Sequence, residues 1–105
     1  MKMMSTPKES FTDVINGSKP VLVDFYADWC SPCKMMKPVL QELHGMMGDR
    51  LRIIKIDTDR NPAVSMQYQI SGIPTLILFK NGQVLWRQSG VVPARQLKQV
   101  LEPYL

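Results

Sequence analysis

A chain of 105 residues is long enough for one domain with a buried core, and 45% hydrophobic with 21% charged residues is typical of a globular protein. The net charge of +4 comes from scattered lysines and arginines, without the basic stripe and interleaved aromatics of a nucleic-acid-binding surface. No apolar run approaches the ~20 residues of a membrane helix, and the N-terminus does not have the pattern of a signal peptide. We therefore expect a single monomeric domain over residues 1–105, located in the cytoplasm, without nucleic-acid or membrane partners.

The first predicted helix begins near the N-terminus. Thr6 is a suitable N-cap, Pro7 suits the first helical position, and Glu9 would complete a capping box. The Asn-Gly pair at positions 16–17 is expected to end this helix. Before the helix there is room only for a very short strand, near residues 2–4.

A central strand is predicted over residues 21–26, because this segment is apolar on both faces, as in a sheet covered on both sides. Helical spacing of apolar residues follows over 33–47, where Pro38 is expected to kink the helix and Gly48 to end it. A second strand is predicted over residues 51–57.

The C-terminal half begins with a short helix predicted over residues 61–72. A strand over 75–79 follows, and the Asn-Gly pair at 81–82 predicts a hairpin to an antiparallel strand over 83–89. A terminal helix is expected to open at Pro93. Its predicted inward face consists of Leu97, Val100, Leu101 and Tyr104.

The alternation of strands and helices predicts an α/β fold. Such an order favours a mostly parallel sheet with helices on both faces, and the hairpin adds antiparallel strands at one side. No repeat, linker or low-complexity segment interrupts this order.

The chemistry-bearing motif is the pair formed by the two cysteines, Cys30 and Cys33. The pair lies between the central strand and the following helix, where free N–H groups and the helix dipole favour negative charge. A thiolate, the reactive form of cysteine, is therefore favoured at Cys30, and Cys33 is within reach to close a disulfide. Pro32 fits the first turn because its ring presets φ there. The motif predicts a redox site.

Half of a zinc site is the competing interpretation of the two cysteines. Structural zinc takes four ligands, usually supplied as two pairs. The sequence offers only one further candidate, His44, without a second C-x-x-C or H-x-x-x-H motif. The spacing therefore favours redox chemistry, and no metal site is expected.

From Phe11 onward the sequence resembles the thioredoxin family. Four motifs carry the resemblance, in order and at matching separations: Val23-Asp24-Phe25 with Ala27, Trp29-Cys30-x-Pro32-Cys33-Lys34 with Pro38, Ile73-Pro74-Thr75 with Leu78-Phe79-Lys80-Asn81-Gly82, and Gly90. The resemblance implies the thioredoxin fold, a central mixed sheet of four to five strands flanked by four helices.

The resemblance also implies catalytic roles. Cys30 would be the attacking thiolate and Cys33 the buried resolving thiol. Asp24 would be the buried acid that handles the proton of Cys33, with Lys55 as its electrostatic partner. Pro74 would be a cis-proline that faces the disulfide.

Each of these last three residues also has a purely structural interpretation. Asp24 could be a hydrogen-bonded core residue, although a carboxylate in so apolar a strand is costly, which favours a function. Lys55 alternates with apolar residues and could simply extend its ammonium to water. Pro74 could be an ordinary proline at the start of a strand.

A client-binding rim is implied by the same resemblance, formed by Trp29, Pro32, Ile73 and Gly90. Ser31, which lies between the cysteines where the commonest family motif has glycine, is also expected to bind the client. Its hydroxyl lies against both sulfurs and could shift the reduction potential.

The expected function is reduction of protein disulfides by thiol–disulfide exchange, with no cofactor beyond the reversible Cys30–Cys33 disulfide. The resemblance implies disulfide-containing client proteins and an NADPH-dependent thioredoxin reductase as partners. Two alternatives stay open. An exported electron carrier or oxidase of the same fold would have a reduction potential well above ~−200 mV. A redox-idle binding subunit would keep its activity without both cysteines.

Overall fold

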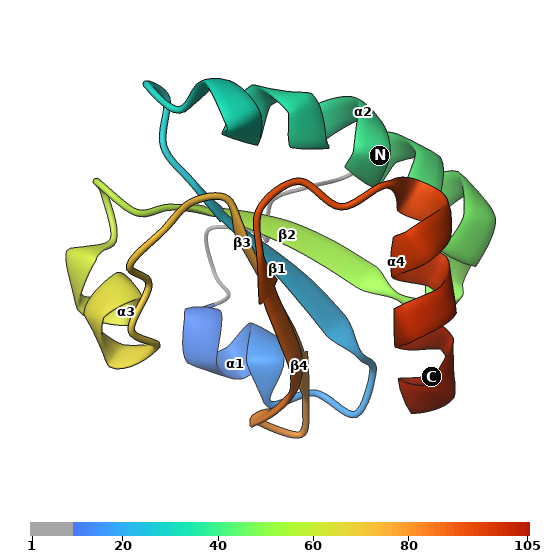
Figure 1. Cartoon of the computed structure of the whole chain (residues 1–105). Coiled ribbons are helices and arrows are strands. Elements are labelled where there is room, and N and C mark those ends of the chain that lie inside the picture. The colour runs from blue at the N-terminus through green and yellow to red at the C-terminus, as the bar shows by residue number, and fades with distance from the viewer. Residues whose placement is uncertain (1–9) are drawn as a thin grey trace.

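The structure is a computed structural model that describes residues 10–105 (Figure 1). Four helices, four strands and two short 3-10 turns are assigned within that range. In chain order they are α1 Phe11–Ile15, β1 Val21–Tyr26, α2 Ser31–Met47, the turn Gly48–Arg50, β2 Arg52–Asp57, α3 Pro62–Gln67, β3 Thr75–Lys80, β4 Gln83–Ser89, α4 Ala94–Leu101 and the turn Glu102–Tyr104. The predicted α/β class is confirmed.

The four described strands form one mixed sheet in the order β2-β1-β3-β4. β1 pairs with β2 in parallel, whereas β1 with β3 and β3 with β4 are antiparallel. The predicted hairpin is confirmed, but the expectation of a mostly parallel sheet is wrong. β3 starts at the edge where β1 and β2 end, since Thr75 lies opposite Phe25, so α3 and its loops do not carry the chain back across the sheet. The strand predicted near residues 2–4 lies outside the described residues.

Helices cover both faces of the sheet, as Figure 1 shows, with α2 and α4 on one face and α1 and α3 on the other. Alternate β1 residues divide between the two layers, as the two-residue period of a strand requires. Leu22 packs with α2 and α4, while Val21, Val23 and Phe25 pack with α1 and residues of α3. None of the helices within residues 10–105 is long and apolar enough to cross a membrane.

Most predicted helix ends are confirmed within a few residues. The start predicted for the first helix, at Thr6, Pro7 and Glu9, lies outside the described residues. Within them α1 begins at Phe11, and the N-cap Ser10 forms a capping box.

Two helices end earlier than expected. α3 ends at Gln67 rather than near Gly72, because the backbone at Gln69 turns to a left-handed φ of +53°. The last α-helix ends at Leu101, and the chain continues in a 3-10 turn, whose three residues per turn rotate the following side chains. Tyr104, expected to point inward, is therefore 38% exposed.

The segments that carry the sequence motifs lie at one edge of the sheet. β1 and β2 end there, at Tyr26 and Asp57, and β4 ends there at Ser89. β3 begins at the same edge, at Thr75. The cysteine motif, the Ile-Pro-Thr motif and the closing glycine, far apart in the sequence, are brought together at this edge.

Candidate active site

The two cysteines lie at the junction between β1 and α2. A tight turn follows β1, closed by the N–H of Cys30, which donates to the carbonyl of Ala27 at 3.2 Å. Cys30 is the N-cap of α2, and Pro32 occupies its first turn. α2 thus begins two residues before the expected start at Cys33, because the cysteine sulfur serves as the cap.

A disulfide joins Cys30 and Cys33, whose Cα atoms are 5.3 Å apart. The backbone N–H of Cys33 donates to the sulfur of Cys30 at 3.2 Å. The same N–H is positioned to stabilise a thiolate at Cys30 after reduction, together with the positive end of the helix dipole. The sulfur closer to the helix entrance is therefore the one whose anionic form the backbone favours.

Exposure does not distinguish the two cysteines in the oxidised protein, since Cys30 is 4% and Cys33 5% exposed. They differ in the cavities that they border. Cys30 borders an open groove, whereas Cys33 borders a smaller pocket on the other side of the turn. The expected contrast between an attacking and a shielded sulfur therefore rests on these cavities and stays a prediction.

The groove beside Cys30 has a volume of about 570 Å³. It is lined by Trp29, Cys30, Ser31, Pro32, Thr58, Ile70, Ser71, Gly72 and Ile73. Four of the five residues expected to bind clients therefore share one surface, and Gly90 does not line it.

The wall opposite the disulfide is the segment before β3. The carbonyl oxygen of Ile73 lies 3.8 Å from the sulfur of Cys30, close enough to interact with a reduced thiol. The Ile73–Pro74 peptide is cis, as expected. Gly90 lies behind this segment with φ of +93°, and its N–H donates to the carbonyl of Pro74 at 2.8 Å. Gly90 thus supports the Pro74 segment from the end of β4.

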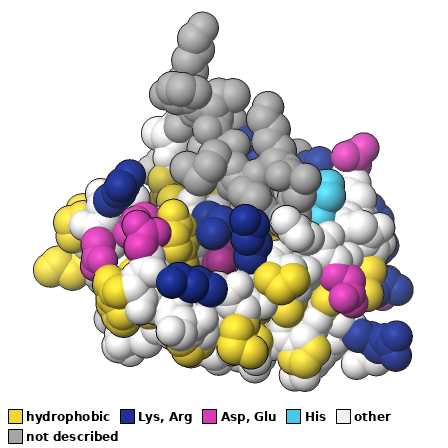
Figure 2. Space-filling view, turned by 90° about the horizontal axis from the view of Figure 1, so that it is seen from above, with side chains coloured by type: hydrophobic (Ala, Val, Ile, Leu, Met, Phe, Trp, Pro, Cys, Tyr) yellow, Lys and Arg dark blue, Asp and Glu magenta, His cyan; other side chains and the backbone are white. Residues whose placement is uncertain are grey.

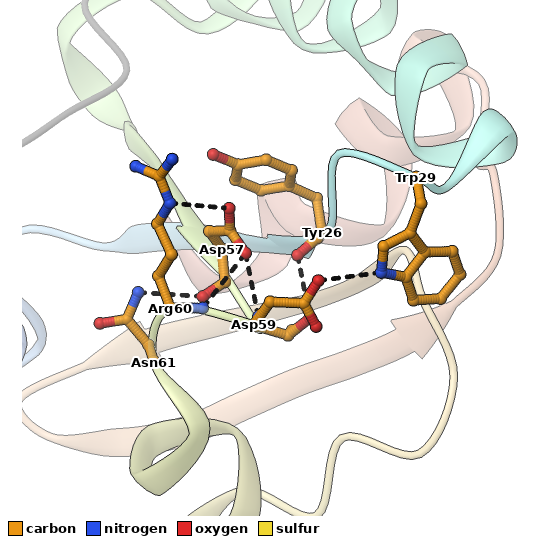
Figure 3. Close-up of polar contacts among 7 residues, drawn as sticks. Tyr26, Trp29, Asp57, Asp59, Arg60 and Asn61 are labelled. Atoms are coloured by element: carbon orange, nitrogen blue, oxygen red, sulfur yellow. Dashed lines mark hydrogen bonds and ion pairs between the residues drawn. The ribbon is translucent and has the colours of Figure 1, made fainter.

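Trp29 forms the other rim of the groove and is 69% exposed. Its indole Nε1 donates to the carboxylate of Asp59 at 2.9 Å (Figure 3). Sequence reasoning missed Asp59. The available signal was its place directly after the second predicted strand, because parallel strands end at the same edge and bring Asp59 near the cysteine motif.

The loop that carries Asp59 is itself held by hydrogen bonds, seen in Figure 3. One carboxylate oxygen of Asp57 accepts the N–H of Asp59 at 2.9 Å and that of Arg60 at 3.4 Å. The side-chain amide of Asn61 donates to the carbonyl of Asp57 at 2.9 Å. The N–H of Thr58 donates to the carbonyl of Tyr26, the last residue of β1, at 2.8 Å. These bonds hold Asp59 in place against the Trp29 indole.

Asp24 lies in the middle of β1 and is 1% exposed. Its Oδ1 is buried and has no hydrogen-bond partner within the described part of the chain. Burial raises the pKa of Asp24 from 3.8 to about 6, and the nearby positive charge of Lys55 lowers it in part. Among residues 10–105 the interpretation of Asp24 as a hydrogen-bonded core residue thus lacks a partner for Oδ1, which favours a functional role.

Lys55 lies directly opposite Asp24 in the parallel β1–β2 pair. Its ammonium lies 4.3 Å from the centre of the Tyr26 ring, a cation–π contact. The structure therefore brings Lys55 near Asp24, as expected.

The pocket beside Cys33 has a volume of about 140 Å³. It is lined by Tyr26, Ala27, Asp28, Cys33, Lys34, Lys37 and Lys55. The face seen in Figure 2 carries lysine and arginine side chains as well as acidic ones.

The zinc interpretation does not fit this geometry. The two sulfurs are bonded to each other, and His44 lies eleven residues beyond Cys33 in the same helix. At 1.5 Å per residue that is about 16 Å, too far for a shared ligand sphere. No group of three or more potential metal ligands occurs among residues 10–105.

Comparison with known proteins agrees with this geometry. The thioredoxin family model matches residues 2–103. A thioredoxin of Acidithiobacillus ferridurans is 49% identical over 94 residues, covering 90% of this chain and 87% of that protein. A thioredoxin of Synechocystis sp. is 42% identical over 107 residues, covering 98% and 100%. The chloroplastic Thioredoxin Y of Oryza sativa subsp. japonica is 47% identical over 97 residues, covering 91% and 58%.

Both the family match and the relatives extend across the cysteine pair and the segment that faces it. The chain therefore belongs to the thioredoxin family and is a thiol–disulfide oxidoreductase that reduces protein disulfides.

Proposed function

We propose that Cys30 attacks the client disulfide and that Cys33 resolves the product. The Cys30 thiolate forms a bond to one client sulfur, and the other client sulfur leaves as a thiolate. Cys33, losing its proton, then attacks the sulfur of Cys30 and displaces the second client thiolate. The client gains two electrons, and the Cys30–Cys33 disulfide forms. The observation that carries this assignment is that Cys30, the N-cap of α2, borders the open groove.

Asp24 is the proposed acceptor of the Cys33 proton. Its pKa of about 6 lets it change protonation state close to neutral pH, which suits a group that accepts and returns a proton. Lys55, whose charge lowers that pKa, favours the ionised form of Asp24. An Asp24→Asn variant is therefore expected to resolve its mixed disulfide more slowly near pH 7, as followed by stopped-flow fluorescence.

The client is proposed to bind as an extended segment along the wall that precedes β3. The backbone of Ile73 would pair with it, and main-chain hydrogen bonds give affinity without sequence specificity. Pro74 and Gly90 shape this wall. Trp29, Pro32 and Ser31 form the opposite side, an arrangement supported by the groove that they line.

The reaction needs no metal or organic cofactor, because the cysteines carry the electrons. We propose an NADPH-dependent thioredoxin reductase as the electron source, acting on a monomeric single domain over residues 1–105. We also propose a cytoplasmic location and a part in electron transport and redox homeostasis. An organellar location, as in the chloroplastic relative, would be an alternative setting for the same reaction.

Reduction of insulin tests the function directly. The protein is expected to accelerate insulin reduction by dithiothreitol, and to consume NADPH when a thioredoxin reductase replaces dithiothreitol. A variant with both Cys30→Ser and Cys33→Ser is expected to be inactive in both assays. Activity that survives in this variant would refute the proposal. An equilibrium potential well above ~−200 mV would instead favour an exported oxidase.

A further inference from the structure

Arg87 of β4 reaches across to the segment that follows α3. One nitrogen of its guanidinium donates to the carbonyl of Tyr68, and Nη2 donates to the carbonyl of Gln69 at 2.8 Å. Arg87 lies opposite Ile77 in the β3–β4 pair, and Ile77 faces the α1 and α3 layer. The side chain therefore projects on the face of the sheet where α3 lies.

The two accepting carbonyls belong to the turn that ends α3. Gln69 lies two residues beyond the last residue of α3, and its φ of +53° is a left-handed conformation that favours glycine. The carbonyl of Tyr68 precedes this residue and that of Gln69 follows it, so the guanidinium holds the peptide groups on both sides. A planar guanidinium with parallel N–H groups is suited to such a two-point contact.

This turn leads directly into the wall of the groove. Ile70, Ser71, Gly72 and Ile73 follow it and line the groove beside Cys30. The far end of the same wall is fixed by Gly90, directly after β4, since its N–H donates to the carbonyl of Pro74.

Between these two ends, the wall has a further support. The hydroxyl of Thr75 donates to the carbonyl of Gly72 at 2.5 Å and lies 2.8 Å from the hydroxyl of Ser89. Arg87 of β4 thus fixes the α3 end of the segment that faces the disulfide, and Ser89 and Gly90, at the end of β4 and directly after it, fix the other end.

We propose that Arg87 is a positioning residue for client binding, which sets the α3 end of the groove wall without touching the sulfurs. The inference rests on the proposed client-binding groove. Its consequence is selective: a protein client, which must lie along the wall, loses affinity when Arg87 is removed. A small disulfide, which needs only the Cys30 sulfur, does not.

The test uses reduced, dithiothreitol-free protein in single-turnover reactions with insulin and with 2-hydroxyethyl disulfide. For Arg87→Ala we expect the insulin concentration at half-maximal rate to rise about threefold to fivefold, as for two solvent-exposed charged hydrogen bonds. The maximal rate, the rate with the small disulfide and the equilibrium potential should remain those of the unchanged protein. Hydrogen exchange at the amides of residues 70–73 should accelerate.

Matched variants keep the outcome interpretable. Arg95→Ala removes the same charge from an exposed position of α4, on the opposite face of the sheet, and should leave both reactions unchanged (Figure 1). Arg87→Lys keeps the charge but loses the two parallel N–H groups of the guanidinium. Its insulin concentration at half-maximal rate should lie between those of Arg87→Ala and the unchanged protein. Urea unfolding confirms that each variant is folded.

The proposal is overturned if Arg87→Ala leaves the insulin dependence unchanged, or if the rates with insulin and the small disulfide fall together. Neither result would affect the proposed function, which fails if the unchanged protein does not reduce insulin or if the variant with both Cys30→Ser and Cys33→Ser still does.

Discussion

Replacing Asp24 by asparagine is expected to stabilise the folded protein at neutral pH. The carboxylate is 1% exposed, and its Oδ1 has no partner within the described residues, so its charged form is poorly solvated in the fold. Burial raises its pKa from 3.8 to about 6 despite the opposing charge of Lys55. Asparagine has nearly the same shape and never carries that charge.

Proton linkage determines the direction in which the contribution of Asp24 to stability changes with pH. Between pH 3.8 and about 6 the folded protein binds more protons at Asp24 than the unfolded chain does. The contribution of Asp24 to stability is therefore fully present below pH 3.8 and is lost as pH rises through about 6. The rise of the Asp24 pKa from 3.8 to about 6 corresponds to roughly 3 kcal/mol at most, at about 1.4 kcal/mol per pH unit. We expect a gain on the order of 1–3 kcal/mol for Asp24→Asn at pH 7 to 8.

Urea unfolding from pH 4 to pH 8 measures this difference. The free energies of unfolding of the variant and the unchanged protein should converge at the acid end and separate between pH 4 and pH 7. Asp28→Asn is the matched control, because it removes the same charge from an exposed position, where substitutions usually change stability by less than ~0.5 kcal/mol. A pH-independent difference, or a variant less stable at pH 7, would refute the argument that Asp24 is destabilised by burial of its charge.

Three further outcomes are expected. Cys33→Ser should accumulate mixed disulfides with insulin through Cys30, seen by non-reducing electrophoresis and peptide mapping; accumulation in Cys30→Ser instead would reverse the assignment. Lys55→Gln should move the pH midpoint of the Asp24-dependent change in stability upward, since Lys55 lowers that pKa; urea unfolding of Lys55→Gln with and without Asp24→Asn measures it, and an unmoved midpoint would contradict the coupling. Gly90→Ala should lower the unfolding free energy by about 1–2 kcal/mol, because φ of +93° strains a residue with a Cβ although the space is open; unchanged urea unfolding would count against strain there.

The local elements of this fold could be predicted because their signals are local. The apolar run of β1, the helical spacing of α2 and the Asn-Gly turn before β4 are each contained in one continuous segment of the chain. The Cys30–Cys33 site was predictable for the same reason, since a strand, a helix start and two thiols adjoin in the chain. The cis state of Ile73–Pro74 was expected from resemblance to a family, not from the physics of the segment itself.

Contacts between segments that are distant in the sequence decided the direction of β3 and the long-range hydrogen bonds of the site. The direction of β3 depends on where the chain re-enters the sheet after α3, and no pattern within the strand encodes it. The bond from Trp29 to Asp59 and the reach of Arg87 to Gln69 join residues that are 30 and 18 positions apart.

The sequence by itself thus determined the kind of each element, the redox motif and the family. Only the tertiary structure decided which polar groups share a site and which stay without a partner, as Oδ1 of Asp24 does among the described residues. The physical reason is the distance along the chain over which each effect acts. Periodicity and capping act over a few residues, whereas desolvation and side-chain hydrogen bonds depend on every segment packed around a group.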